Sequence, residues 1–227
     1  MATHSYDVLI RLAPDLPASM LERAAQWTRD SVPSPAAPAA SVILLRDGPS
    51  GLDTYLLHRH ARMAFAPSMV VFPGGRVDAE DASGERDPIR RCALRETSEE
   101  TGVVLTDTNL YPWAHWITPE IEPRRYDTTF FVAAMPDDQE AADISGETDH
   151  ADWSTPGEGL AAARAGRISM LPPTMSILIE LADLATVADV INQATDRKIE
   201  PVLPQLVETE SGWRFRYPSA GPRETSV

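Results

Sequence analysis

Nine residues carry most of the information about the fold: Arg95-Glu96-Thr97-Ser98-Glu99-Glu100-Thr101-Gly102-Val103. Glu96, Glu99 and Glu100 stand at positions i, i+3 and i+4, so a helix brings their three carboxylates to one face. Like charges at this spacing repel each other. Mg²⁺ and Mn²⁺ prefer carboxylate oxygens as ligands and would reverse that repulsion. The stretch therefore predicts a helix that offers a divalent-cation site.

The residues around this stretch predict where the helix begins and ends. Asp87-Pro88 is typical of an N-cap followed by proline at the first helical position, and Gly102 of a C-terminal stop. Upstream, a short predicted strand at 69–72 continues into Pro73-Gly74-Gly75. A lone acidic helix face is usually solvated surface. Strand, glycine turn, acidic helix and stop together indicate a built site.

Length and composition limit the class of protein. The chain has 227 residues, 43% of them hydrophobic and 24% charged, which allows one large domain or one domain with appendages. Its formal net charge of −14 argues against a nucleic-acid partner. A phosphate-containing small molecule stays possible, because a bound metal supplies local positive charge.

The compartment predicted from the sequence is the cytoplasm. Cys92 is the single cysteine, so no intramolecular disulfide can form. No apolar run is long enough for a membrane span, and residues 1–7 lack a signal-peptide pattern. We therefore expect no membrane partner.

The chain divides into an N-terminal segment, 1–38, and a main domain, 39–227. The first holds a predicted helix at 18–29 and a proline-rich linker, and is interpreted as a dimer arm or a packed extension. The main domain ends in a predicted helical extension. We expect a mixed sheet with helices against it, in the α/β or α+β class. The expected strands are 41–45, 54–60, 69–72, 110–117, 126–134 and 212–217, the further helices are 155–166, 173–185 and 187–195, and 136–152 is an acidic loop.

With Gly74-Gly75 placed upstream, the acidic helix resembles the Nudix hydrolase box. The resemblance implies an α/β/α sandwich around a mixed β-sheet. Thr97 departs from the family pattern, which has an apolar residue at this position. The spacing from Gly75 to Arg95 is about six residues longer than in the family. The first acid of the box is then Asp81, counting forward from Gly75, or Asp87, counting back from Arg95; we favour Asp87, which adjoins the helix. The matching positions are Arg95, Glu96, Glu99, Glu100, Gly102 and Val103.

A longer resemblance, over roughly residues 39–185, is to the Nudix subgroup of the mammalian peroxisomal coenzyme A diphosphatase. That subgroup also has an insertion inside the box. The similar segments are Arg62-x-x-Phe65-x-Pro67, 71–78, 116–119, 124–131, Glu147, and 153–156 downstream of it.

The resemblance implies a pyrophosphohydrolase that uses Mg²⁺ or Mn²⁺. Glu96, Glu99, Glu100 and the Gly75 carbonyl (or that of Gly74) are the expected metal ligands, and Arg95 orients the carboxylates. The general base is Glu100 or Glu147. Four arginines are expected to meet substrate phosphates, because guanidinium suits bidentate phosphate contact; these are Arg62, Arg76, Arg124 and Arg125.

The leading substrate is coenzyme A or an acyl-CoA. ADP-ribose, NADH, nucleotide sugars and damaged nucleoside triphosphates are alternatives. A function of another class is a non-catalytic Nudix-fold protein that senses a nucleotide.

Two histidines lie outside this pattern. His58 and His60 alternate on the predicted strand at 54–60 and share a face. We interpret them as polar residues near the substrate or at the surface, with paired imidazole ligation of a metal as the alternative.

Overall fold

The computed structural model of this chain describes residues 6, 8–10, 16, 18–28, 30–63, 66–83, 86–210 and 212–217. Within them, a nine-stranded sheet runs in the order β8-β3-β2-β1-β6-β5-β9, with β4 paired to β1 and β7 paired to β2. Parallel and antiparallel pairs both occur, so the sheet is mixed. Its strands are β1 (Ala36–Gly48), β2 (Gly51–Arg59), β3 (Met69–Val71), β4 (Gly74–Arg76), β5 (Tyr111–Ile117), β6 (Arg125–Ala134), β7 (Thr148–Ser154), β8 (Ser169–Met170) and β9 (Pro201–Val202).

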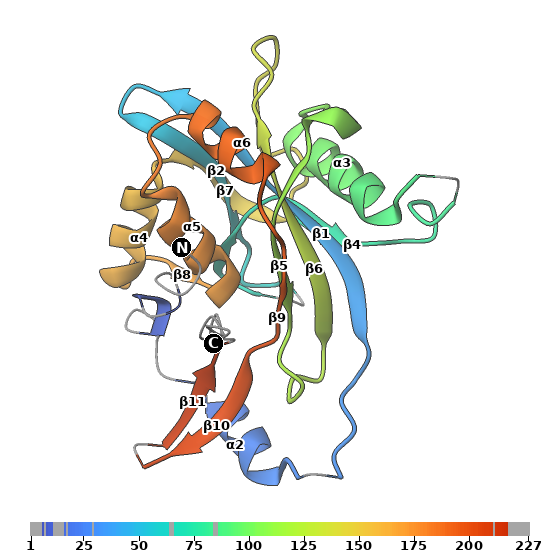
Figure 1. Cartoon of the computed structure of the whole chain (residues 1–227), viewed down its shortest axis with the longest axis vertical. Helices are drawn as coiled ribbons and strands as arrows, with labels where there is room; N and C mark the ends of the chain where they lie inside the picture. The colour runs from blue at the N-terminus through green and yellow to red at the C-terminus, as the bar shows by residue number, and fades with distance from the viewer. Residues whose placement is uncertain are drawn as a thin grey trace, which may run out of the picture.

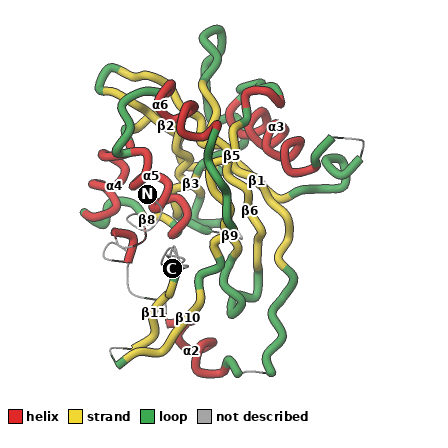
Figure 2. The backbone as a smooth tube through the Cα atoms, viewed as in Figure 1, coloured by secondary structure: helices red, strands yellow, loops and turns green. Residues whose placement is uncertain are grey.

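Helices cover both faces of this sheet, as Figures 1 and 2 show. α3 lies on one side, and α4, α5 and α6 lie on the other. Beside the sheet lie a short helix, α2, and a two-stranded hairpin, β10–β11. The bounds are α2 (Ala18–Gln26), α3 (Pro88–Thr101), the 3₁₀ helix η1 (Asp107–Asn109), α4 (Pro156–Arg164), α5 (Pro172–Leu181), α6 (Val187–Thr195), β10 (Gln205–Thr209) and β11 (Gly212–Arg216).

The alternation along β1 explains why both faces are covered. Ile43 and Leu45 belong to the core beneath α4, α5 and α6, whereas Val42 and Leu44 belong to the core beneath α3. A strand with apolar residues on both faces is stable only between two helical layers. The predicted α/β/α sandwich is confirmed.

Most predicted elements are present, with their ends shifted by a few residues. The helix predicted from Asp87 begins at Pro88, and the Asp87 side chain accepts a hydrogen bond from the Ile89 N–H. It ends at Gly102, whose φ of 72° is left-handed and whose N–H donates to the Ser98 carbonyl. The first strand is longer than 41–45, because its N-terminal half pairs in parallel with β6 from Ala36 onward.

Two predictions of irregular structure were wrong. The acidic loop expected over 136–152 becomes a strand, β7, from Thr148 onward, because an edge strand paired with β2 tolerates polar side chains. The predicted glycine turn leads directly into a strand that was not predicted: Gly74 and Gly75 are the first residues of β4, although glycine is depleted in strands. The C-terminal extension, predicted to be helical with a last strand at 212–217, contains that strand as β11 and two strands that were not predicted, β9 and β10.

α2 packs against its own chain. Ala24 is 2% exposed, and Arg23 forms an ion pair of 2.6 Å with Glu122, in the connection between β5 and β6. Dimerisation through this helix stays a prediction. Among the described residues, no helix combines the length and apolar character needed to cross a bilayer.

Candidate active site

A cavity of about 870 Å³ opens between α3, the first half of β1 and the strands β5 and β6. Glu96, Glu99 and Glu100 line one side of it, next to Gly74 and Gly75. These glutamates are the ones that helical spacing places on one face. The structure therefore brings the predicted carboxylates and the predicted glycine turn into one cavity.

The glycine turn is held against the acidic helix by direct contacts. The Gly74 N–H donates to Glu100 Oε2 at 2.8 Å. A Cβ atom built on Gly75 would lie 2.2 Å from Glu96 Oε1, so only glycine allows β4 to approach the carboxylate this closely. β4 itself is fixed by antiparallel pairing with Ala39, Ala40 and Ser41 of β1.

Arg95 gathers the acidic side chains. Its Nη1 donates to Glu96 Oε1 at 2.8 Å and to Glu99 Oε2 at 2.9 Å. Its Nε and Nη2 hold both oxygens of Asp81, at 3.1 and 2.7 Å. Hydrogen bonds to these three acids, with that to Asp81 the largest cause, raise the pKa of Arg95. The guanidinium is therefore a fixed fork that sets the direction of two of the three glutamates.

The two candidates for the first acid of the box have different contacts. Asp81 is 2% exposed and is bonded to Arg95. Burial raises the pKa of Asp81, but the hydrogen bonds from Arg95 and from the Asp78 N–H outweigh it, and the net pKa is lowered. Asp87 caps α3 and accepts its hydrogen bond from Ile89. The acid that reaches Arg95 is thus Asp81, six positions after Gly75, and the extra residues follow it.

Thr97 is compatible with the apolar slot that it occupies. It is fully buried, and its hydroxyl donates to the Ala93 carbonyl at 2.7 Å, one helical turn back. A buried hydroxyl with an internal partner carries little desolvation cost.

Burial raises the pKa of two of the three glutamates. Burial raises the pKa of Glu100 to about 8, against the hydrogen bond from Gly74, and the Glu96 charge adds to the rise. Burial also raises the pKa of Glu96, although Arg95 opposes this. Both carboxylates lie where a further positive charge would stabilise their ionised form.

Glu147 reaches the same cavity from the residue before β7. It lines the cavity and forms an ion pair of 3.5 Å with Arg59 at the end of β2. Its side chain is 49% exposed, compared with 5% for Glu100 as a residue. The two candidates for the general base therefore share one cavity, and Glu147 is the one open to water.

The four arginines predicted to contact substrate have different positions. Arg76 and Arg124 line the cavity. Arg125 is 9% exposed, and its guanidinium donates to the backbone carbonyls of Thr118 and Ser34. Its side chain is therefore bonded to the backbone and does not face the cavity. Arg62 donates to the carbonyl of Gly146 at 3.4 Å, beside the rim formed by Glu147.

The profile of the NUDIX domain matches residues 35–172, which include the strand, turn, helix and both candidate acids just described. This chain belongs to the NUDIX family. The family prediction made from the box is confirmed.

Similar proteins include a nudix hydrolase and an acyl-coenzyme A diphosphatase. One is the Caenorhabditis elegans protein named nudix hydrolase 7, which is 30% identical over 190 residues that make up 68% of this chain and 63% of that protein. The chain thus spans a little under two thirds of that relative. The other is the acyl-coenzyme A diphosphatase NUDT19 of Xenopus laevis, 22% identical over 262 residues, or 72% of this chain and 69% of that protein.

Solved structures share the NUDIX fold. The crystal structure of a NUDIX hydrolase from Alicyclobacillus acidocaldarius has a TM-score of 0.64 at 22% identity, covering 74% of this chain and 99% of that one. The NUDIX domain of Shewanella oneidensis NrtR, complexed with ADP ribose, has a TM-score of 0.51 at 14% identity, covering 74% and 98%.

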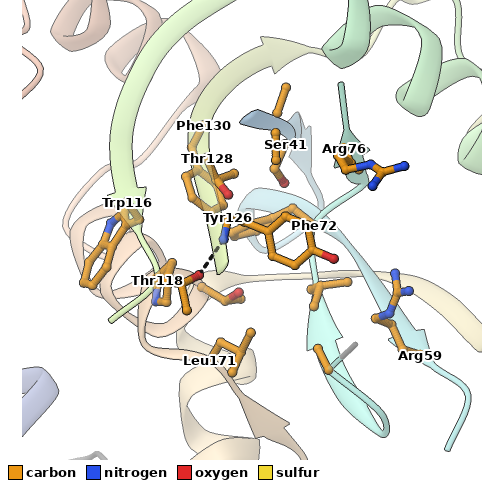
Figure 3. Close-up of a pocket in the computed structure, with 18 of the residues that line it drawn as sticks. Ser41, Arg59, Phe72, Arg76, Trp116, Thr118, Tyr126, Thr128, Phe130 and Leu171 are labelled. Carbon is orange, nitrogen blue, oxygen red and sulfur yellow. Dashed lines mark hydrogen bonds between the residues drawn. The ribbon is translucent and has the colours of Figure 1, made fainter. Parts of the chain in front are cut away.

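The cavity of this NUDIX protein has an apolar wall opposite its charged residues. In Figure 3, Trp116 and Phe130 lie on one side and Arg59 and Arg76 on the other, with Tyr126 between them. Tyr126 is anchored by its N–H, which donates to Thr118 Oγ1 at 3.1 Å. Lining residues from outside the 35–172 match include Met20, Thr174, Pro204 and Phe215.

Sequence reasoning missed Arg59 and the apolar wall. Side chains alternate between the two faces of β2, so Arg59 lies on the face opposite His58. This alternation was the signal in the sequence that could have identified Arg59. Phe215 and Met20 had no such signal, since only tertiary structure brings the chain ends to the NUDIX cavity.

Proposed function

We propose that this NUDIX protein is a metal-dependent hydrolase that cleaves the pyrophosphate bond of a nucleoside diphosphate linked to another group, with coenzyme A or an acyl-CoA as leading substrate. The observation that supports it most is the meeting of Glu96, Glu99 and Glu100 with the Gly74-Gly75 turn in one cavity of about 870 Å³. A cavity of that volume accommodates a ligand of nucleotide-derivative size.

The residues on this wall suit Mg²⁺ or Mn²⁺. Three carboxylates face the cavity, the buried ones have raised pKa values, and oxygen ligands are what these ions prefer. We assign Glu96, Glu99 and Glu100 as the side-chain ligands, with the Gly75 carbonyl as a candidate backbone ligand. When bound, such an ion lowers the pKa of coordinated water and neutralises phosphate oxygens.

Arg95 and Asp81 are assigned as positioning residues. Asp81 fixes the guanidinium through two hydrogen bonds, and the guanidinium fixes Glu96 and Glu99 through one nitrogen. We therefore place Asp81, rather than Asp87, at the first acidic position of the box. Ligand side chains held in this way lose less conformational entropy on binding an ion.

Glu147 is our choice for the general base. Glu100 already accepts the Gly74 N–H with one oxygen and is buried, whereas Glu147 is half exposed and lines the cavity. In the reaction, water attacks one phosphorus, its proton passes to the carboxylate, and the bond from that phosphorus to the bridging oxygen breaks. Coenzyme A would yield phosphopantetheine and adenosine 3′,5′-bisphosphate.

Arg59, Arg76 and Arg124 are assigned to the substrate phosphates. All three line the cavity, and Arg59 Nε is buried with no hydrogen-bond partner within the described part of the chain. A buried guanidinium N–H beside the acidic wall is a suitable donor for a phosphate oxygen.

The apolar wall supports the choice of coenzyme A or acyl-CoA. Trp116, Phe130, Leu171 and Phe215 give the cavity a surface that an apolar substrate portion can cover. The relative named acyl-coenzyme A diphosphatase points to the same substrate class. ADP-ribose is the main alternative, as the ligand of the related NrtR NUDIX domain; NADH and nucleotide sugars follow.

A non-catalytic nucleotide sensor is the alternative of another class. Such a protein has no need of Glu96, Glu99 and Glu100 together, and their joint presence favours the enzyme. We also propose a cytoplasmic location, from the single cysteine and the composition.

A substrate panel tests the proposal. Coenzyme A, a long-chain acyl-CoA, ADP-ribose, NADH and a nucleotide sugar are each incubated with Mg²⁺, with Mn²⁺ and with EDTA, and products are identified by mass spectrometry. We expect phosphopantetheine products that require the metal. Cleavage of ADP-ribose but not of coenzyme A compounds would overturn the substrate, and no cleavage of any compound would favour the sensor.

A further inference from the structure

We infer that His58, His150 and Asp152 form a second metal site, which binds a first-row transition-metal ion such as Zn²⁺ and is independent of the carboxylate site on α3. Each of the three residues offers one ligand atom, and these atoms lie within 4.8 Å of one another. Two imidazoles and one carboxylate are a common protein ligand set for zinc, with water in the remaining position.

Strand pairing brings these residues together. His58 of β2 lies directly opposite His150 of β7, and Asp152 lies two residues further along β7, opposite Leu56. Residues two apart on a strand share a face, so all three side chains project from one side of this strand pair. β2 and β7 run beside each other in Figure 1.

The site lies on the other face of β2 from the cavity. His58 precedes Arg59, which lines the cavity, and successive side chains on a strand point to opposite faces. An ion held here is separated from the substrate by the strand itself.

A β-bulge in β7 shapes this surface. His58 pairs with His150, but the next residue, Arg59, pairs with Thr148, so Asp149 is the extra residue on β7. Asp149 forms an ion pair with His60. Alternation along the strand had placed His58 and His60 on one face as a possible pair of ligands. The bulge gives them different neighbours on β7: an aspartate for His60 and another histidine for His58.

The three side chains already lie close together, and binding an ion requires the two stacked rings to turn toward it. The His58 and His150 rings are stacked, with centroids 3.8 Å apart and planes at 22°, and His58 Nε2 lies 3.3 Å from Asp152 Oδ1. With metal–ligand distances of about 2.1 Å, tetrahedral ligand atoms are about 3.4 Å apart. The Asp152 side chain is 53% exposed, so it can rotate toward the two rings without disturbing the core.

The ligand types separate the two sites chemically. Imidazole nitrogens favour Zn²⁺, Cu²⁺ and Ni²⁺, whereas the three glutamates on α3 favour Mg²⁺ and Mn²⁺. Excess Mg²⁺ therefore competes with Zn²⁺ at the carboxylate site but not at the histidine site. Because the ligands come from two strands, the bound ion would also fasten β7 to β2.

Isothermal titration of Zn²⁺ into the full chain, freed of metal and held in excess Mg²⁺, tests the inference. We expect one Zn²⁺ per chain in the original protein, and affinity at least 10-fold lower in His150→Asn and in Asp152→Asn. The matched control is His115→Asn, which removes another histidine that is paired with an aspartate, Asp127, on neighbouring strands. We expect this control to bind normally.

Two outcomes would overturn the inference. One is the absence of one-to-one Zn²⁺ binding in the original protein; the other is unchanged affinity in Asp152→Asn, whose exposed position leaves folding intact. Zn²⁺ binding that is lost in Glu96→Gln/Glu99→Gln but kept in His150→Asn would assign the ion to α3 instead and would equally contradict it. Far-UV circular dichroism checks that each variant is folded.

Discussion

The two walls of the cavity differ in chemistry and in origin. The acidic wall comes from α3 and the Gly74-Gly75 turn, within a short segment of chain. The apolar wall draws Trp116 from β5, Leu171 from before α5 and Phe215 from the C-terminal hairpin. The first is local and fully inside the NUDIX match, whereas the second is assembled by tertiary structure and extends beyond it. The difference indicates that the two walls of the cavity are encoded separately in the sequence.

The largest expected effect is on the acidic wall. Glu99→Gln is expected to lower kcat by about 100-fold or more, because charge neutralisation by a bound ion contributes several kcal/mol to the reaction. Folding is expected to be unchanged, since the Glu99 side chain is 58% exposed. Glu140→Gln, the same change at an exposed position in the connection before β7, is the control and is expected to have normal kcat. Equal rates in both variants would contradict the metal site.

Asp81 and Asp87 provide a second test of this wall. Asp81→Asn breaks a buried ion pair with Arg95 and is expected to lower the free energy of unfolding by about 3 kcal/mol. It should also lower activity by about 10-fold, because in the proposed site Arg95 positions the metal ligands. Asp87→Asn keeps a side-chain oxygen that can accept the Ile89 N–H and removes only the negative charge at the helix N-terminus, for about 0.3–1 kcal/mol, with normal activity. Urea unfolding measures the stability of each variant, and a turnover assay measures its activity. Larger effects in Asp87→Asn than in Asp81→Asn would mean that Asp87 is the first acid of the box.

The acidic wall also predicts a pH dependence of stability without metal. The pKa of Glu100 rises on folding from 4.5 to about 8, so the folded state binds an extra proton between these values. The free energy of unfolding should then fall as pH rises through this window, by on the order of a few kcal/mol. The pKa of Asp81 is lowered from 3.8, so Asp81 affects the pH dependence of stability only below this pH, outside the window. Glu96, whose pKa is also raised, contributes with the same sign. Glu100→Gln should therefore reduce the slope of the profile in EDTA, and an unchanged slope would contradict the role of Glu100.

The smallest expected effect is on the apolar wall. Phe215→Ala is expected to raise KM for a long-chain acyl-CoA by about 10-fold while leaving kcat within a factor of about two, because one apolar contact is worth about 1–3 kcal/mol. Trp213→Ala is the matched control, since Trp213 lies two residues earlier on β11 and lines a different pocket. The same change in KM in both variants would mean that the hairpin acts only through stability.

The contrast between the walls also explains what the sequence could predict. The acidic helix, its cap at Asp87 and its stop at Gly102 follow from local rules, and the structure has all three. The choice between Asp81 and Asp87 needed the turn that carries Asp81 back to Arg95, where Asp78 and Asp81 exchange hydrogen bonds between side chains and backbone. Spacing alone has no means of locating an insertion within a loop.

Strand pairing was the other source of missed features. His58 faces His150 across 92 positions of sequence, in the last pair before a bulge in β7. Arg59 meets Glu147 for the same reason. Alternation predicts the face on which a residue lies but not its neighbour on the next strand, so these contacts could be seen only in the folded chain.

The most direct test of the central claim is Mn²⁺ binding at the acidic wall, measured by electron paramagnetic resonance of free Mn²⁺ alongside coenzyme A turnover. In the original protein we expect one-to-one or higher binding that rises together with activity. In Glu96→Gln/Glu99→Gln we expect affinity at least 10-fold lower and turnover lost, with the same far-UV circular dichroism. Equal Mn²⁺ affinity and equal turnover in the two proteins would contradict the assignment of Glu96, Glu99 and Glu100 as the metal site.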